Sequence, residues 1–170
     1  MKVLIYAGAS EPVSAKYPGI ADESFARRLE RVCLSYLSGA GVIPAAAVDV
    51  EISLTFMSAD EIAALNGKYR ETEGPTDVLS FPMWEAEDGA FQPPEDWEVL
   101  PLGDIVVCPE VVEKNAGDNG KTFEEEKALV IFHGVLHLTG CDHDTEERKA
   151  DMWSRQDAMV LAFKSEENGK

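Results

Sequence analysis

All three histidines of this chain lie within eleven residues, at His133, His137 and His143. On a helix, His133 and His137 are one turn apart and project from the same face. Gly140 is a natural place for the chain to leave that helix, which would bring His143 back toward the other two. Three imidazoles that converge from a helix and its exit loop predict an open tetrahedral zinc site, with the fourth position left for water.

The type of ligand limits the metal without fixing it. Neutral imidazole suits Zn²⁺, although Ni²⁺, Co²⁺ or Cu²⁺ can occupy the same nitrogens. Cys141 lies inside the histidine motif and is an alternative fourth ligand, but a closed fourth position would suit a structural site. The alternative to any metal site is a set of structural histidines satisfied by hydrogen bonds.

The residue after the first histidine distinguishes between the reactions that a three-histidine zinc site could catalyse. The register H-x-x-x-H-x-x-G-x-x-H is the ligand skeleton of the metzincin zinc peptidases. In H-E-x-x-H enzymes the residue after the first histidine is the glutamate that acts as general base, whereas this chain has Gly134. Zinc still lowers the pKa of its water to roughly 7, so hydrolysis of a phosphodiester is compatible with the motif. An RNA substrate carries its own 2′-OH nucleophile, and a cation must then stabilise charge on the phosphate.

The elements that must position these residues can be read from hydrophobic patterns. Thr122 and Glu125 form a capping-box sequence, and the nearly continuous apolar run that follows predicts a buried central helix. Strict alternation over 48–56 predicts a half-buried strand. Further strands are expected at 2–7, 78–81 and 103–108, and further helices at 22–38, 58–67, 110–116 and from about 144. The fold class is therefore α+β, with a single mixed β-sheet packed with helices and a central buried helix that carries two of the zinc-ligand histidines.

Several charged residues leave alternatives open. Arg27, Arg28 and Arg31 fall on one side of the helix at 22–38, where they form either a solvated face or a stripe that contacts RNA or a partner. Asp142 and Asp144 either orient imidazole N–H groups or, for Asp144, cap the last helix.

Length and composition indicate a single domain over 1–170 with a sizeable core, since 45% of the residues are hydrophobic. No apolar run is long enough for a membrane span, and three widely spaced cysteines favour a reducing compartment, so we expect a cytoplasmic protein. The net charge of −17 disfavours broad attraction to nucleic acid. The segment 85–98 holds six acids and no base and is expected to be a surface loop, and the tail after Lys164 is expected to fray.

Three stretches in order resemble the YbeY family of bacterial endoribonucleases and rRNA maturation factors. They are His133–His143, the run Leu65–Arg70 with Pro75–Pro82, and Leu102–Val106. Together they span about residues 60–147. Cys141 departs from the family pattern, which usually has tyrosine there, and the acidic 85–98 segment is longer than expected.

The resemblance implies one zinc per chain, held by His133, His137 and His143. It implies a single-strand-specific endoribonuclease that acts in small-subunit rRNA maturation and ribosome quality control. Arg70 is the expected cleft arginine, and guanidinium suits phosphate because it is permanently charged and can bind two oxygens. We therefore assign catalytic roles to Arg70 and His133. The expected partners are single-stranded rRNA precursors and the ribosomal small subunit or its proteins, with no membrane.

Two rival functions remain at this point. The first is a zinc hydrolase of another class, including a peptidase whose base lies elsewhere in the chain. The second is a non-enzymatic ribosome-assembly module with a structural zinc, for which the strong negative charge would favour docking on basic ribosomal proteins. The sequence does not specify the native metal, the scissile position, the general base, the oligomeric state, or the roles of Cys141 and segment 85–98.

Overall fold

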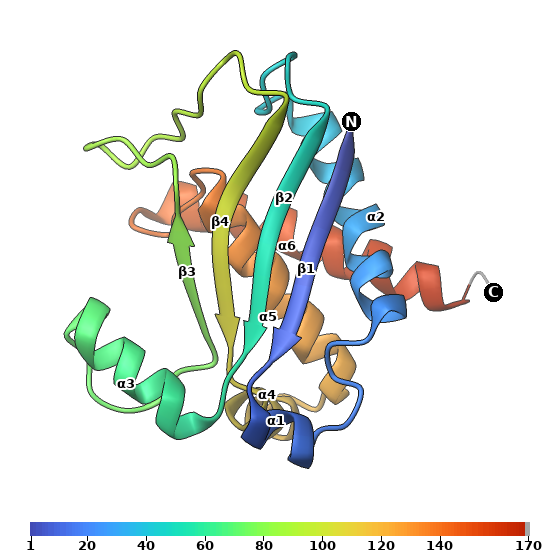
Figure 1. The fold of residues 1–170 in the computed structure, drawn as a ribbon, viewed down its shortest axis with the longest axis vertical. Coiled ribbons are helices and arrows are strands. Elements are labelled where there is room, and N and C mark those ends of the chain that lie inside the picture. Colours follow the sequence, from blue (N-terminus) through green and yellow to red (C-terminus); the bar gives the residue numbers. More distant parts are fainter. Residues whose placement is uncertain (169–170) are drawn as a thin grey trace.

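The computed structural model describes residues 1–168, and the side chains of residues 1–166. Six helices and four strands are formed by these residues (Figure 1). In chain order they are β1 (Lys2–Ala9), α1 (Glu11–Lys16), α2 (Glu23–Ala40), β2 (Asp49–Phe56), α3 (Ala59–Arg70), β3 (Val78–Pro82), β4 (Val99–Val107), α4 (Pro109–Asp118), α5 (Phe123–Leu138) and α6 (Glu146–Asn168).

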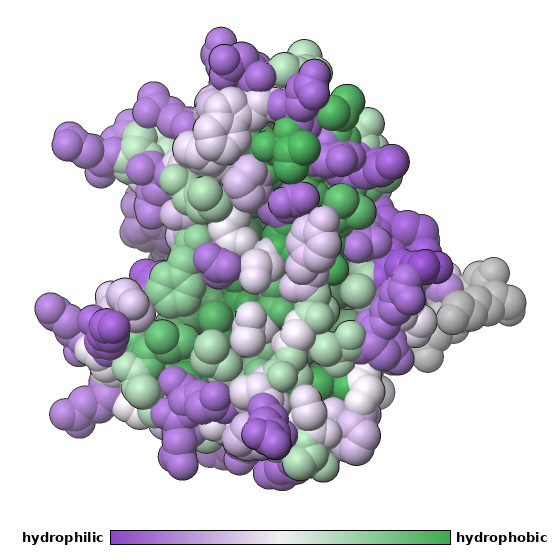
Figure 2. Space-filling model, in the orientation of Figure 1, coloured by the Kyte–Doolittle hydropathy of each residue, from purple (hydrophilic) through white to green (hydrophobic). Residues whose placement is uncertain are grey.

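One mixed sheet organises the fold, as the sequence predicted. The strand order is β1-β2-β4-β3, in which β1, β2 and β4 run parallel and β3 is antiparallel to β4. Helices α5 and α6 lie behind this sheet, and the opposite face is open to view (Figure 1). Figure 2 shows that apolar and weakly polar residues cover the middle of the open face, with strongly hydrophilic residues around its rim.

The alternating pattern of β2 is confirmed by its burial. Val50, Ile52, Leu54 and Phe56 are buried and alternate with partly exposed residues, so one face of the strand enters the core behind the sheet. The capping box of α3 is also confirmed, because Ser58 accepts from Glu61 N–H and the Glu61 carboxylate accepts from Ser58 N–H.

Helix α5 is the central helix that the sequence predicted. It contacts β3, β4, α2, α4 and α6, and most of its residues are buried. Its N-terminus is capped by Thr122, whose Oγ1 accepts from Glu125 N–H at 3.1 Å. Two of the three histidines therefore stand on an element whose position is fixed by packing on several sides.

Strand β4 begins earlier than the sequence predicted. Its early part contains Pro101, which lies beside a bulge, where the register against β2 skips Leu102. Gly103, at the bulge, has φ +140°, and a Cβ on this residue would lie 2.2 Å from the Phe81 carbonyl oxygen of β3. The close approach of β3 to β4 thus depends on a residue without a side chain at this position.

The three arginines of α2 differ in their exposure to solvent, contrary to the expectation that they share one face. Arg27 and Arg31 are exposed and pair with Glu23 and Glu166. Arg28 is instead buried, because it joins α2 to two other helices: Nη1 donates to Glu124 of α5 at 2.9 Å, and Nη2 donates to the Phe163 carbonyl of α6 at 3.1 Å. The three residues therefore do not form one solvated face, and each has an acidic partner.

The C-terminal part of α6 extends beyond the expected helix. We expected a frayed tail after Lys164, but α6 continues to Asn168; residues 169 and 170 lie outside the described part of the chain. The inward-facing residues Met152, Met159 and Phe163 are buried, as the sequence predicted, and Val160 is partly buried. The segment 85–98 forms a loop with one isolated bridge between Glu85 and Phe91. No described helix is long and apolar enough to cross a membrane.

Replacing Gly103 with alanine is expected to destabilise the protein by about 2 kcal/mol or more, because the new Cβ meets the β3 backbone at an unfavourable φ. The matched control is Gly8→Ala in β1, where a Cβ meets nothing within 4 Å; it should change the free energy of unfolding by less than about 1 kcal/mol. Urea unfolding of both variants measures the difference, and equal stabilities would contradict this account of the bulge.

Candidate metal centre

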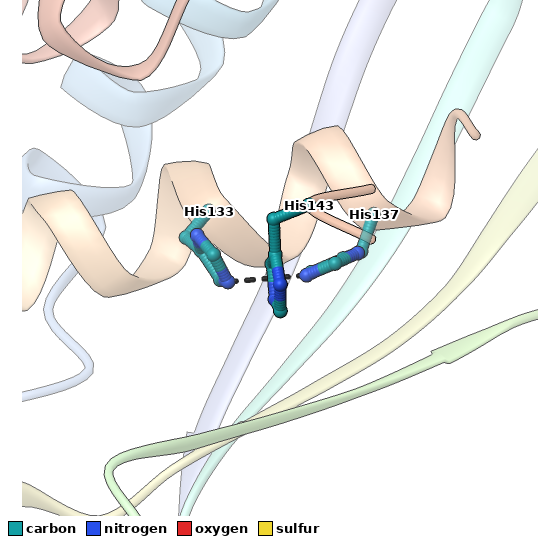
Figure 3. Close-up of side chains that lie close together, drawn as sticks. All are labelled: His133, His137 and His143. Carbon is teal, nitrogen blue, oxygen red and sulfur yellow. Dashed lines mark hydrogen bonds between the residues drawn. The ribbon is translucent and has the colours of Figure 1, made fainter. Parts of the chain in front are cut away.

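The three histidines converge at the C-terminal end of α5 (Figure 3). His133 and His137 project from one face of the helix, and His143 comes from the exit loop, with its ring centroid 5.8 and 5.4 Å from theirs. One ring nitrogen from each lies within 4.8 Å of the others, and the Nε2 atoms of His133 and His137 are 3.1 Å apart. Nitrogens bound tetrahedrally to zinc at about 2.0–2.1 Å are about 3.3–3.4 Å apart, so the cluster is close to the spacing that a metal requires.

Gly140 brings His143 into the cluster. Its φ of +93° turns the chain out of α5, and Cys141 N–H then donates to the Leu136 carbonyl at 2.9 Å. The turn also packs against the 85–98 loop, since a Cβ on Gly140 would lie 3.1 Å from Phe91 Cβ. Glycine is therefore required at this position both for the turn and for the space it leaves to the loop.

A hydrogen bond from α6 fixes the orientation of His133. Its Nδ1 lies 2.8 Å from Gln156 Oε1. An amide oxygen only accepts, so Nδ1 carries the hydrogen and Nε2 presents its lone pair to the cluster. This is the arrangement in which a metal-binding imidazole is held by an outer hydrogen-bond partner.

Burial favours the neutral form of His133 and His137. Desolvation lowers the pKa of His133, an effect that the Gln156 hydrogen bond opposes and the nearby His143 reinforces. Desolvation, with a further contribution from His133, lowers the pKa of His137 to about 4. The neutral imidazole is the form that a metal needs.

Trp153 of α6 encloses one side of the cluster. Its ring centroid is 5.7 Å from those of His133 and His143, nearly perpendicular to each. Neither Trp153 nor Gln156 was predicted from the sequence as a site residue. A signal was present for Gln156, because it falls on the inward face of α6 between Met152 and Met159, where a polar residue needs a buried partner.

The histidines open into a cavity of about 390 Å³. Arg70, expected from the sequence as a site residue, lines it and is the only arginine or lysine among the described residues that do. Its Nη2 donates to the Ser80 carbonyl of β3 at 2.7 Å, which holds the guanidinium at the cavity wall. The acids Asp77, Glu85 and Asp142 also line the cavity. The structure therefore brings together all four site residues named from the sequence, in predominantly acidic surroundings.

Gly134 lies where helix α5 packs closely against strand β4. A Cβ at this position would lie 3.1–3.2 Å from three side-chain atoms of Ile105 on β4. Helix α5 therefore packs closely on the sheet here, and any side chain at this position would have to displace Ile105. This contact disfavours the glutamate of an H-E-x-x-H peptidase at position 134.

The nearby acids do not orient the imidazoles, and Cys141 is not a fourth ligand. Asp142 accepts from the His143 backbone N–H at 2.7 Å, and Asp144 pairs with Arg148. Within residues 1–168, no imidazole hydrogen bond to either carboxylate is found. The cap of α6 is Thr145, whose Oγ1 accepts from Arg148 N–H at 3.1 Å, and so Asp144 is not the cap. Cys141 Sγ lies 3.8 Å from Tyr36 Oη and is not part of the ligand cluster.

Comparisons with known proteins agree with this geometry. A family model described as "Endoribonuclease YbeY" matches residues 19–164. Proteins of that name from Alkaliphilus oremlandii (strain OhILAs) and Parafrankia sp. (strain EAN1pec) are 41% and 37% identical to the chain over 116 and 118 residues. The matches cover 68% and 66% of this chain, and 74% and 72% of the relatives.

A solved structure extends the likeness over the whole fold. The solution structure of TM1509 from Thermotoga maritima aligns with a TM-score of 0.60 and 28% sequence identity, covering 98% of this chain and 92% of that one. The family match, the relatives and the mixed sheet bearing a three-histidine cluster lead to one conclusion: this chain belongs to the Endoribonuclease YbeY family.

Proposed function

We propose that this protein is a zinc-dependent endoribonuclease that cleaves single-stranded RNA in small-subunit rRNA maturation and ribosome quality control. The observation that carries the proposal is the placement of Arg70 and three convergent histidines on one open cavity, with no general base at Gly134. The whole chain acts as one domain in this proposal, in the cytoplasm and on ribosomal small subunits.

His133, His137 and His143 would hold one Zn²⁺. When bound, the ion supplies a Lewis acid that polarises a phosphoryl oxygen and lowers the pKa of water at its open position to roughly 7. Gln156 keeps the His133 lone pair directed to the cluster. Trp153 shields two of the rings from solvent on one side.

Arg70 would bind the phosphate on the opposite side from the helix. One of its N–H groups is used at Ser80, which leaves the others of the planar guanidinium for phosphate oxygens. Its charge is fixed at every relevant pH, so it can stabilise the negative charge that develops as the phosphodiester is attacked. Together with the metal, it offsets the acids at Asp77, Glu85 and Asp142.

The rival functions fit less well. This chain lacks the glutamate of an H-E-x-x-H peptidase, and a side chain in its place at Gly134 would have to displace Ile105. A structural zinc would be expected to have four protein ligands, whereas the described cluster has three and faces a cavity of about 390 Å³. The net charge of −17 is consistent with docking on basic ribosomal proteins, which brings the enzyme to its RNA without a broad basic surface.

Replacing His137 with alanine should remove the metal and lower RNA cleavage by about 100-fold or more, since an open site has no spare ligand. The free energy of unfolding of the metal-free variant should lie within about 1 kcal/mol of that of metal-free wild type, because His137 is only half-buried. Elemental analysis, RNA cleavage and urea unfolding measure these quantities. Loss of the fold in the variant would favour the structural-zinc rival.

Replacing Arg70 with alanine should lower cleavage of single-stranded RNA by about 100–1,000-fold while zinc content stays the same, as expected for loss of one preorganised charge-stabilising group. Arg70→Lys should retain part of the activity, because it keeps the charge without the planar fork. The matched control is Lys68→Ala, an exposed cation on the same helix that does not line the cavity. Equal rates for Arg70→Ala and Lys68→Ala would show that Arg70 has no catalytic role.

Replacing Gln156 with leucine should weaken Zn²⁺ binding by about 10–100-fold, because His133 loses the partner that fixes its tautomer. Gln156→Glu keeps an acceptor oxygen at His133 Nδ1 and should bind zinc at least as tightly as wild type. Competition with a chromophoric chelator gives both affinities. A Gln156→Leu protein that binds zinc as well as wild type would refute the orienting role.

A further inference from the structure

A second cavity, of about 360 Å³, adjoins the first. The two share Asp77, Val78 and His133 as wall residues and therefore lie side by side. The remaining lining residues of the second cavity come from α5, α6 and the turn before α5: Asn119, Lys121, Glu126, Leu129, Val130, Trp153, Gln156 and Asp157.

Glu126 is a buried acid that the proposed reaction does not use. It lies seven residues before His133 on α5, which places both on the same side of the helix. Glu126 is 5% exposed, and its Oε2 has no hydrogen-bond partner among the described residues. Burial also raises its pKa, although Lys121 opposes this effect. A buried carboxylate oxygen without a donor is costly, so a donor from outside the chain is expected to reach it.

Gln156 adds a donor to the same cavity. It is also 5% exposed, and its Oε1 is taken by His133 Nδ1. The amide is thereby oriented, and its NH₂ group makes no hydrogen bond to a described residue. The second cavity thus presents a buried donor from α6 and a buried acceptor from α5.

The other walls suit a flat aromatic group. Leu129 and Val130 supply apolar contact, and Trp153, which is 38% exposed, supplies a ring on which a base can stack. Apolar walls with a few buried polar groups are typical of a small-molecule or nucleobase pocket.

We propose that the second cavity binds the nucleobase next to the scissile phosphate and prefers guanine. This inference rests on the proposed nuclease function. The Watson–Crick edge of guanine presents one acceptor, O6, beside two donors, N1–H and N2–H. The Gln156 NH₂ group can donate to O6, and the two oxygens of the Glu126 carboxylate can accept from N1–H and N2–H. Adenine and cytosine present a donor where Gln156 donates and an acceptor where Glu126 accepts, so they are mismatched at both groups. Uracil matches Gln156 with O4 and Glu126 with N3–H, but it presents the acceptor O2 where guanine presents N2–H, so it forms one contact fewer.

The first arm of the test measures cleavage. Metal-loaded wild type should cut a randomised single-stranded RNA pool with guanosine enriched at one position beside the cut. Glu126→Gln should lower that enrichment by about tenfold, in line with loss of a paired base contact, while cleavage beside other bases continues. The matched control, Glu11→Gln, removes an exposed acid on α1 and should leave the preference unchanged.

The second arm measures binding without catalysis. NMR of the Trp153 indole N–H should show that guanosine binds more tightly than inosine, which lacks the N2 amino group, and more tightly than adenosine. This comparison uses wild-type protein and therefore does not depend on how the Glu126 variant folds. Equal binding of guanosine and adenosine, or equal enrichment in wild type and Glu126→Gln, would overturn the proposal. If wild type cleaves no RNA, the proposed nuclease function is wrong. Preferential binding of guanosine would still show that the second cavity binds this base.

Discussion

The close packing of Gly134 on Ile105 determines what the histidines can do. It brings α5 close to the Ile105 side chain of β4, and His133 and His137 of the same helix line the cavity beside β3. A side chain at position 134 would have to displace Ile105. The contact therefore disfavours a larger residue at the position where a related motif has its general base in peptidases. The chemistry available to the site follows from how the helix meets the sheet.

Strand β3 supplies the opposite side of the cavity, and it depends on the bulge in β4. Gly103 allows the Phe81 carbonyl to approach closely, which seats β3 on β4 as an antiparallel edge strand. The Ser80 carbonyl of this strand then receives Arg70 from the end of α3. The guanidinium and the histidines come from elements far apart in sequence, and they meet only because α5 and β3 flank the same edge of the sheet. A substitution at the bulge that displaced β3 would therefore be expected to displace Arg70 more than the metal-ligand histidines.

Sequence patterns predicted the features that depend on interactions between residues close together in the chain. The apolar run of α5, the alternation of β2 and the glycine exit before His143 each follow from neighbouring residues, and all three are found. What the sequence missed depends on contacts between distant elements. Arg28 is buried because α5 and α6 offer it Glu124 and the Phe163 carbonyl, and Gln156 meets His133 only after α6 has packed on α5. Pro101 is tolerated in β4 because a bulge lies beside it, which the strand signal cannot reveal.

Charge remains the strongest constraint on how this protein meets RNA. The cavity contains three acids and one arginine, so without a metal it would repel a phosphate. A bound divalent cation reverses that balance close to the histidines and leaves the rest of the acidic surface unchanged. Phosphate binding would then be confined to the site of reaction, and wider attraction to the backbone would be absent. A nuclease built in this way must gain its selectivity from contacts beside the scissile phosphate and from a partner that delivers the RNA. The buried pair Glu126 and Gln156 lies where the first of these contacts would be made.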